Sequence, residues 1–473
     1  MHKKIKHLIK NIKDVFEIDE INKIAKETKF VQRKSNITAK DFLIFNVFHG
    51  EDICSAPLSQ LVSRYDVLFD TQVSKQALDK RFNKNSVKFM QEIFNRMMMS
   101  ENTTLKDLET ILNSHFNRVI INDSTGFALP KEFKKEFPGA GGSGSTSSIK
   151  IQLQYELLSG SFMRIDIYPG TKSDAEYLRT MNKDKERKDL KLADLGYFKV
   201  EYLKKLDKSD TSFISKVKSN TSLYIKNPNP ERYKVGTIKK SSEYIKIDIL
   251  ELAKPLAEGE TVELKDIYIG SKKELKSRLI VTKLTEENKI KRQITHQENI
   301  RKKRGTLKQN RIDFNSINAY ITNVSDEILA DTQVHDLYTL RWQIEIMFKV
   351  WKSIFKISQV KKVKMERFKC FLYGRLIALL LSSSIVSTAK NTILEEEGKE
   401  LSEIKSYGAL AQYLPKLACK IFKGELCIIR ILKRIIRNFK RLGIKSRKKH
   451  KKTVFDILEI LLLKPSEIEK IAI

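Results

Sequence analysis

Four side chains of different chemistry recur at helical spacing in the stretch 337–358, LYTLRWQIEIMFKVWKSIFKIS. Tyr338, Arg341, Glu345 and Lys352 are separated by three, four and seven residues, which predicts one stripe of a helix within an arc of roughly 60°. A carboxylate oxygen suits a metal ion, and two cations with a phenol suit a phosphate beside it. The alternative interpretation is a solvated helix face with incidental ion pairs.

Further elements are needed to hold such a stripe in place. Leu340, Ile344, Met347, Trp351 and Ile354 lie on the opposite side of the same predicted helix and should face a core. Two predicted strands each end at an aspartate. The run 118–122 (RVIIN) is apolar and β-branched and leads to Asp123, and a strand near 190–193 leads to Asp194 in the sequence DLGYF. By itself, Asp123 is equally consistent with a turn residue.

The spacing Tyr338-x2-Arg341-x3-Glu345-x6-Lys352 resembles the YREK signature of the insertion-sequence-four family of bacterial DDE transposases, which includes the transposon-five enzyme. The resemblance extends over about residues 119–383. It implies that Glu345 is the third catalytic carboxylate and that Tyr338, Arg341 and Lys352 bind DNA-end phosphate. The DLGYF context is similar to that of the second catalytic aspartate, which favours Asp194 over the weaker candidates Asp189 and Asp184.

The resemblance also implies a fold and a chemistry. The fold is α/β, with an RNase H-like (retroviral integrase-like) catalytic core, a β-rich insertion domain, and helical N-terminal and C-terminal regions. Asp123, Asp194 and Glu345 would converge on two Mg²⁺ ions, for which Mn²⁺ can substitute, roughly 3.5–4 Å apart. Water would nick the element's end, and the freed 3′-OH would then attack target DNA. The enzyme would work as a homodimer that pairs two DNA ends in a synaptic complex.

Composition supports a polyanionic partner. Ninety Lys and Arg residues against 58 Asp and Glu residues give a net charge of +32, which favours nucleic acid over an anionic membrane surface. The longest apolar run, 376–389, is short for a membrane span and predicts a buried helix. No secretory signal, CxxC pair or HExxH motif is present, so we expect a cytoplasmic protein whose metal is held by oxygen. The resemblance implies in addition that the protein is bacterial and nucleoid-associated.

The N-terminal residues read as helical. Within them, the segment 58–82 has two short helical patterns joined by a turn, with Ser74 placed to cap the second. Lys75, Gln76, Lys80 and Arg81 would be exposed on that second helix. The segment therefore indicates a helix-turn-helix that enters a major groove, and a plain helical hairpin fits equally well.

The segment after Asp123 predicts the rest of the core. The stretch 138–148 contains a formal GxGxxG, but no strand precedes it and no helix follows, so it indicates a mobile loop. Alternation predicts strands at 149–157 and 162–168, and a helix begins after Ser173. Three strands followed by a helix are the opening of an RNase H-like fold.

Residues 226–310 predict the β-rich insertion, because alternating runs occupy 244–249, 261–269 and 278–284. In the transposon-five enzyme a tryptophan of the insertion domain stacks on an extruded DNA base. Here the two tryptophans, Trp342 and Trp351, both lie on the predicted Glu345 helix. Tyr233, Tyr244 and Tyr268 are possible replacements, and a hairpin route of excision stays open.

Five regions follow from these patterns, with a basic helical run over 285–311 between the insertion and the second part of the core. The segment 430–452 carries twelve Lys and Arg residues and no acid. Interleaved apolar residues predict a basic amphipathic helix in at least its first part, in contact with DNA, with a solvated tail or a membrane surface as the alternatives. The regions are a helical DNA-binding region at 1–112, the first part of the core at 113–225, the insertion at 226–310, the second part of the core at 311–390, and a basic helical region at 391–473.

Two other functions remain open from the sequence. One is a catalytically inactive or repurposed DNA-binding relative, although all three acids are present. The other is an RNase H-like nuclease that cleaves DNA without joining strands. Strand-transfer assays would separate these functions from a transposase.

Overall fold

The computed structural model describes residues 3–108, 116–141, 144–178, 188–303, 312–446 and 452–459. The chain divides into two compact units, each made from segments that are distant in sequence. Unit 1 contains residues 1–111, 123–172 and 343–451, and unit 2 contains residues 112–122, 173–342 and 452–473. The strand β1 (Arg118–Ala128) is shared, because the division falls between Asn122 and Asp123.

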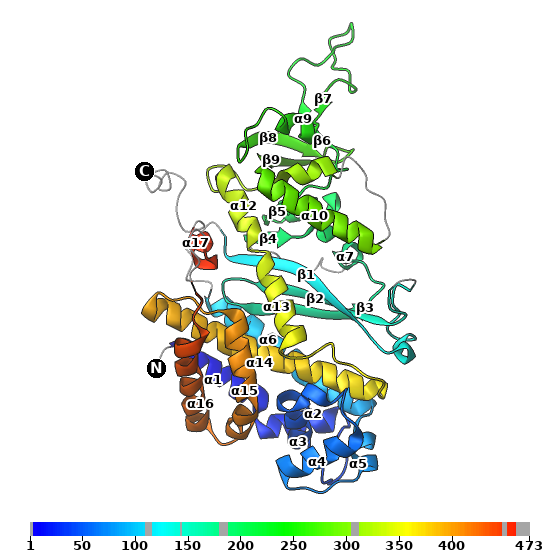
Figure 1. Ribbon diagram of the computed structural model, residues 1–473, viewed down its shortest axis with the longest axis vertical. Coiled ribbons are helices and arrows are strands. Elements are labelled where there is room, and N and C mark those ends of the chain that lie inside the picture. Colours follow the sequence, from blue (N-terminus) through cyan, green and yellow to red (C-terminus); the bar gives the residue numbers. More distant parts are fainter. Residues whose placement is uncertain are drawn as a thin grey trace. The chain divides into compact units, whose positions relative to one another are not determined.

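Unit 1 is mainly helical and its core is built on the long helix α14 (Met365–Glu397). This helix packs against α3, α6 and α15 (Figure 1). Its side chains are buried over most of its length. The other helices of unit 1 are α1 (Lys3–Phe16), α2 (Ile18–Glu27), α3 (Ala39–Phe48), α4 (Leu58–Phe69), α5 (Lys75–Arg81), α6 (Lys84–Leu108), α13 (Trp342–Ser353, except its first residue), α15 (Glu403–Ile421) and α16 (Glu425–Asn438).

Two buried arginines of α14 tie it to the N-terminal helices. Arg375 donates to the carbonyl oxygens of Asn46 (2.9 Å) and Val47 (2.6 Å) near the end of α3, and Arg367 donates to that of Ile53 (2.6 Å). The last carbonyls of a helix lack partners within the helix, so a buried guanidinium there satisfies groups that would otherwise be lost from water. Burial lowers the pKa of Arg375 to about 10.

The apolar run 376–389 lies inside α14, as a buried helix. The apolar run alone is short for a membrane span, but the whole helix, at 33 residues, is long enough to cross a bilayer. The most apolar window of this helix is 83% buried within the protein, as is usual for a core helix. The cysteines Cys54, Cys370, Cys419 and Cys427 are all free thiols.

The sheet of unit 1 consists of the second part of β1, then β2 (Ser148–Glu156) and β3 (Ser161–Pro169). β2 and β3 are antiparallel, with Ile151 opposite Ile167 and a bulge after Gln154. The predicted strands at 149–157 and 162–168 therefore exist, shifted by about one residue. Pro138 forms an isolated bridge with Ser147, so the Gly/Ser stretch closes as a loop between β1 and β2.

In unit 2, hydrogen bonds order the strands β1-β4-β5-β10-β9-β8-β6-β7. β4 is parallel to both β1 and β5, whereas β10 is antiparallel to β5 and β9. The strands are β4 (Asp189–Ala193), β5 (Ser212–Lys216), β6 (Leu223–Lys226), β7 (Tyr244–Lys246), β8 (Thr261–Ile269), β9 (Leu275–Lys283) and β10 (Ile317–Thr322). Strands β1 to β3 followed by β4 and β5 parallel to β1 give the expected RNase H-like core.

The β-rich segment is continuous with this core rather than a sheet of its own. β9 pairs with β10 over six consecutive positions, from Ile317 opposite Lys283 to Thr322 opposite Arg278. The strands β6 to β9 therefore extend the core sheet (Figure 1). The helices of unit 2 are α7 (Asp174–Tyr177), α8 (Val200–Lys208), α9 (Ile249–Ala253), α10 (Glu286–Lys303), α12 (Asp331–Thr339) and α17 (Val454–Glu459).

Candidate active site

The stretch that contains the four signature residues is two helices, so the prediction of one continuous stripe is wrong. α12 ends at Thr339 and α13 begins at Trp342. Between them, the amides of Leu340 and Arg341 bond to carbonyls three residues back, at 3.1 Å each, and this tighter turn changes the rotation per residue. Tyr338 and Arg341 consequently lie in unit 2, whereas Glu345 and Lys352 lie on α13 in unit 1.

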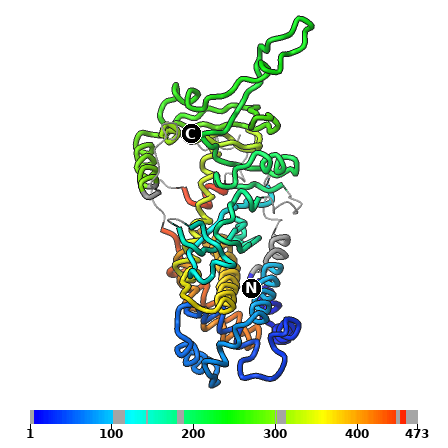
Figure 2. The backbone as a smooth tube through the Cα atoms, turned by 90° about the vertical axis from the view of Figure 1, so that its right-hand side faces the viewer, coloured from blue at the N-terminus to red at the C-terminus, as the bar shows by residue number. Residues whose placement is uncertain are grey.

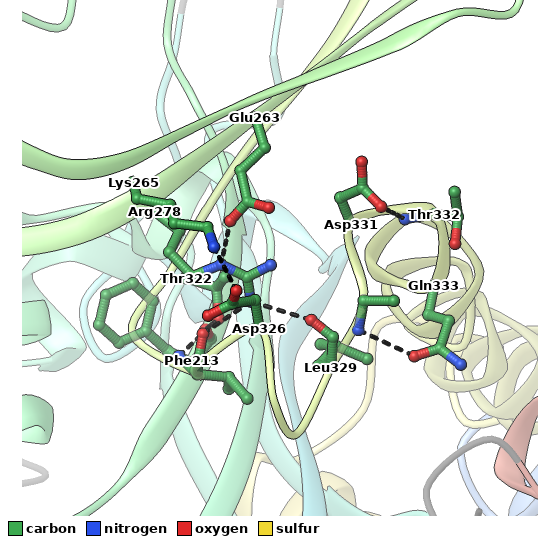
Figure 3. Close-up of polar contacts among 12 residues, drawn as sticks. Phe213, Glu263, Lys265, Arg278, Thr322, Asp326, Leu329, Asp331, Thr332 and Gln333 are labelled. Atoms are coloured by element: carbon green, nitrogen blue, oxygen red, sulfur yellow. Dashed lines mark hydrogen bonds and ion pairs between the residues drawn. The ribbon is translucent and has the colours of Figure 1, made fainter. Parts of the chain in front are cut away.

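The loop that leads into α12 is held by a buried arginine that sequence reasoning did not single out. Arg278 on β9 donates to the carbonyl oxygens of Val324 (2.8 Å) and Leu329 (2.9 Å) and pairs with Glu263 on β8 (Figure 3). At the start of α12, the amide of Ala330 donates to the side chain of Gln333 at 3.0 Å. These contacts fix the entry of α12, and with it the position of Tyr338.

Asp194 follows the last residue of β4 and is partly exposed, next to the 3-10 turn Leu195–Tyr197. Tyr338 lies beside it: the phenol donates to the carbonyl oxygen of Ala193 at 3.4 Å, and burial together with the charge of Asp194 raises the pKa of Tyr338. The Tyr338 ring packs on Tyr320 of β10, with centroids 5.1 Å apart. This phenol therefore supports the strand end that carries Asp194.

Lys216 is a residue near Asp194 that sequence reasoning missed as a site residue. Ala193 on β4 is the partner of Ser215 on β5, so the residues that follow them, Asp194 and Lys216, leave the ladder side by side. The Lys216 ammonium lies 5.6 Å from the centre of the Tyr338 ring. Burial, with help from Arg292 and Arg341, lowers its pKa to about 8, and Asp194 opposes that shift. The sequence signal is weak: Lys216 follows the short apolar run 213–214, and only the pairing of β5 with β4 brings it beside Asp194.

Arg341 is buried and its guanidinium lies 5.9 Å from the ring of Trp342. Trp342 itself is 60% exposed, which is unusual for an indole. The two residues form the turn between α12 and α13, so a buried cation and an exposed aromatic ring lie next to each other on unit 2.

Unit 1 holds the other two acids. Asp123 lies within β1 rather than at its end, because the strand continues to Ala128, and its carboxylate accepts from the amide of Ser124 at 2.7 Å. Glu345 lies in the first turn of α13 and is partly exposed. Lys352, in the last turn, donates to the carbonyl oxygen of Gly126 on β1 at 2.9 Å, and burial lowers its pKa. This contact ties the helix of Glu345 to the strand of Asp123.

The alternative second acids differ in environment. Asp189 is the first residue of β4, and its carboxylate is 1% exposed and bonded twice to Arg118, at 2.8 and 2.7 Å. A buried carboxylate held by both oxygens in an ion pair is a structural group rather than an open ligand. Asp184 lies outside the described residues.

The donor set suits a hard divalent cation, since Asp123, Asp194 and Glu345 offer oxygen ligands and are all partly exposed. Within the described ranges, no three His, Cys, Asp or Glu side chains gather closely enough to hold a metal ion. Asp123 and Glu345 belong to unit 1 and Asp194 to unit 2, so their convergence remains a prediction.

The segment predicted as a helix-turn-helix forms α4 and α5, and Ser74 caps α5 by accepting from the amide of Ala77 at 3.1 Å. Lys75, Gln76 and Lys80 are exposed, as expected. Arg81 is not: it donates to the carbonyl oxygens of Phe30 and Ile37 and lies over the Phe30 ring, so it holds the hairpin instead of facing outward.

The family model and the relatives that match this chain in sequence agree on a family. Residues 114–381 match the model of the transposase DDE domain. The chain is 69% identical over its whole length, and that of the relative, to the transposase for insertion sequence element IS1151 of Clostridium perfringens. It is 38% identical to the transposase for IS231F of Bacillus thuringiensis subsp. israelensis, over 93% of this chain and 92% of the relative. A solved piggyBac transposase synaptic complex with hairpin DNA aligns at 11% identity and a TM-score of 0.48, over 95% of this chain and 87% of that one.

Proposed function

Because the chain belongs to the DDE transposases of bacterial insertion sequences, an enzyme family that cleaves DNA and transfers strands, we propose that Asp123, Asp194 and Glu345 are its catalytic carboxylates. DDE domains generally use divalent metal ions. In this proposal the three carboxylates hold two Mg²⁺ ions, or Mn²⁺. Bound there, the ions would activate the attacking oxygen and stabilise the leaving 3′ oxygen.

One observation carries the assignment of the two aspartates. In the parallel ladder of β1 and β4, Asn122 is the partner of Ala193, and the next residues along the two strands are Asp123 and Asp194. Residues in register on neighbouring parallel strands project to the same face. The same register places Asp189 opposite Arg118, at the other end of the ladder. The competing acid thus starts β4, whereas Asp194 follows its last residue.

Glu345 completes the set through α13. The bond from Lys352 to Gly126 holds the last turn of α13 against β1, three residues beyond Asp123. Glu345 lies two turns earlier on the helix, about 10 Å along its axis, and Asp123 lies about 10 Å earlier along the strand. Asp123, measured along the strand, and Glu345, measured along the helix, therefore lie at similar distances before the contact between Lys352 and Gly126.

The cations around the acids would bind DNA. Arg341, which can hold a phosphate by two hydrogen bonds, and Lys352, a point charge, would grip the phosphate of the cleaved end, with the Tyr338 phenol beside them. Lys216 would add a charge next to Asp194, where a phosphodiester between the metals would lie. To reach DNA, Lys352 would exchange its bond to Gly126 for one to phosphate.

The substrate is double-stranded DNA: the element's ends for cleavage and a target for the freed 3′-OH. In this proposal the enzyme pairs two ends as a homodimer. The N-terminal region 1–112 contacts the ends through α5, and the region 391–473 contributes backbone contacts through α16. The core (113–225 and 311–390) carries the chemistry in the cytoplasm, and the β-rich insertion (226–310) separates its two parts in the sequence.

The test is cleavage and strand transfer with element-end DNA in Mg²⁺, Mn²⁺ and Ca²⁺. Asp123→Asn, Asp194→Asn and Glu345→Gln should each abolish both steps while retaining DNA binding, and Ca²⁺ should support binding alone. Joining of pre-cleaved ends distinguishes a transposase from a nuclease that only cuts. Cleavage by any of the three variants at the wild-type rate would remove that residue from the proposal.

A further inference from the structure

Unit 2 has a long hairpin that projects from its sheet and is not part of its core. Between β6 and β7 the chain extends through residues 227–243 and returns, away from the sheet (Figures 1 and 2). The eight consecutive residues from Glu231 to Ile238 are all exposed. We refer to residues 227–243 as the arm.

The arm is an ordered ribbon. Its base is closed by the amide of Asn227, which donates to the carbonyl of Glu243 at 2.9 Å, and its middle by Lys239, whose amide donates to that of Glu231 at 2.8 Å. At the tip, the amide of Tyr233 donates to the carbonyl of Thr237 and that of Gly236 donates back to Tyr233, both at 2.8 Å. Gly236 has φ +85°, which the turn requires. A two-stranded ribbon alone is marginally stable in water.

Two kinds of side chain cover the arm and its base. From 226 to 246 there are six cations against two glutamates. Lys234 and Lys240 are exposed and form no ion pair with any described residue. Large apolar groups lie at the tip, where Tyr233 is 55% exposed and Val235 82% exposed. An exposed apolar tip on a cationic ribbon matches a nucleic acid groove, with phosphates on both sides and bases on its floor.

We propose that the arm, which leaves the unit 2 sheet at the edge far from β4 and Asp194, binds duplex DNA, with Lys234 and Lys240 on the phosphates and Val235 in the groove. The inference rests on the DNA-cleaving activity of the family and not on the choice of catalytic acids. A ribbon of about eight residues on each side reaches roughly 25 Å. The arm would thus lengthen the DNA contact and contribute affinity that does not depend on base sequence.

Three variants test the arm in the full chain. The first replaces residues 228–242 by Asn-Gly, which closes the ribbon with a two-residue turn next to the Asn227–Glu243 pair. The second is Lys234→Gln with Lys240→Gln, and the third is Val235→Ser. The matched control is Lys254→Gln with Lys399→Gln, which removes equal charge from lysines already paired with Glu251 and Glu397. A thermal transition like wild type shows that each variant folds.

Affinity is measured against salt on an element-end duplex and on a generic duplex. The double lysine variant should reduce the slope of log K against log salt by about 1.8, at 0.9 per phosphate. The control should leave it unchanged, and Val235→Ser should weaken binding without changing the slope. The shortened arm should bind both duplexes more weakly and lose one short block of its hydroxyl-radical footprint.

Two results overturn the inference. In the first, the shortened arm binds DNA with wild-type slope and footprint. In the second, it changes the sedimentation of the protein from dimer to monomer while the footprint of each chain is kept, which would make a second copy of the chain the partner. If the shortened arm loses its footprint while the protein still cleaves DNA, the arm inference stands and the proposed catalysis is unaffected. If the carboxylate variants fail their own test while the arm footprint behaves as expected, only the catalytic proposal is affected.

Discussion

Asp189 and Asp194, five residues apart, allow a structural acid to be separated from the acid that we propose to be catalytic. Asp189→Asn should destabilise the protein while leaving metal-dependent cleavage in the folded fraction. Its side chain is 1% exposed and holds Arg118, itself 20% exposed, through two short bonds. Removing one partner of a buried pair costs about 3–5 kcal/mol. Because Arg118 still reaches some water, we expect about 3 kcal/mol.

Asp194→Asn should behave in the opposite way. The carboxylate is partly exposed and makes no capping hydrogen bond to the turn that follows, so its loss should cost less than about 1 kcal/mol. Cleavage, however, should fall to background. Burial alone therefore predicts which aspartate serves the fold and which serves the chemistry.

The assay is thermal unfolding paired with cleavage at a temperature where both variants are folded. A loss of 3 kcal/mol should lower the midpoint of the transition of unit 2 by about 6–12 °C. Arg118→Met with Asp189→Leu should recover much of it, because an apolar pair avoids desolvating two charges. If Asp189→Asn is as stable as wild type yet inactive, or Asp194→Asn cleaves normally, the reasoning is refuted.

Three further outcomes are expected. Lys352→Ala should lose strand transfer on pre-cleaved ends while costing at most about 1 kcal/mol of stability, and normal transfer would mean that this lysine serves only its bond to β1. Neutralising the four exposed cations of α16 should reduce the salt slope of DNA binding by about 3.6 if each meets a phosphate, and by nothing if the helix is merely solvated; they are Arg430, Lys433, Arg434 and Arg437. Burial and nearby arginines lower the pKa of His49 to about 4, so the unfolded chain binds more protons than the folded chain between pH 4 and 6.5. The wild-type protein should therefore lose stability as the pH falls through that window. His49→Gln should lose less, as measured by chemical unfolding.

Local patterns predicted the elements near the acids well. The β-branched run before Asn122 is the start of β1, the run before Asp194 is β4, and the Ser74 cap is present. These features depend on a few consecutive residues. Alternation and capping chemistry are local, so a sequence displays them directly.

Features that depend on distant segments were not predictable. A helical wheel assumes an unbroken helix, but the chain turns between α12 and α13. Tyr338 bonds to the end of β4, and Arg341 in the turn is buried. Lys216 gained its place only through the pairing of β5 with β4. Arg81 was expected to be exposed, because arginine side chains usually are. Its guanidinium instead donates hydrogen bonds to two carbonyl oxygens that are distant in sequence.

The long helix α14 has a consequence for how the chain comes to be folded. α3 and α6 pack against it, and Arg375 bonds to α3, yet more than three hundred residues separate Asn46 from that arginine. On the ribosome, the N-terminal helices are made long before α14 leaves the exit tunnel. Their apolar faces therefore have no α14 to pack against until then. A nascent chain or a product truncated before residue 365 would expose those faces and aggregate or be degraded. The DNA contact proposed for the N-terminal helices would thus be delayed until the polypeptide that carries Glu345 has been synthesised.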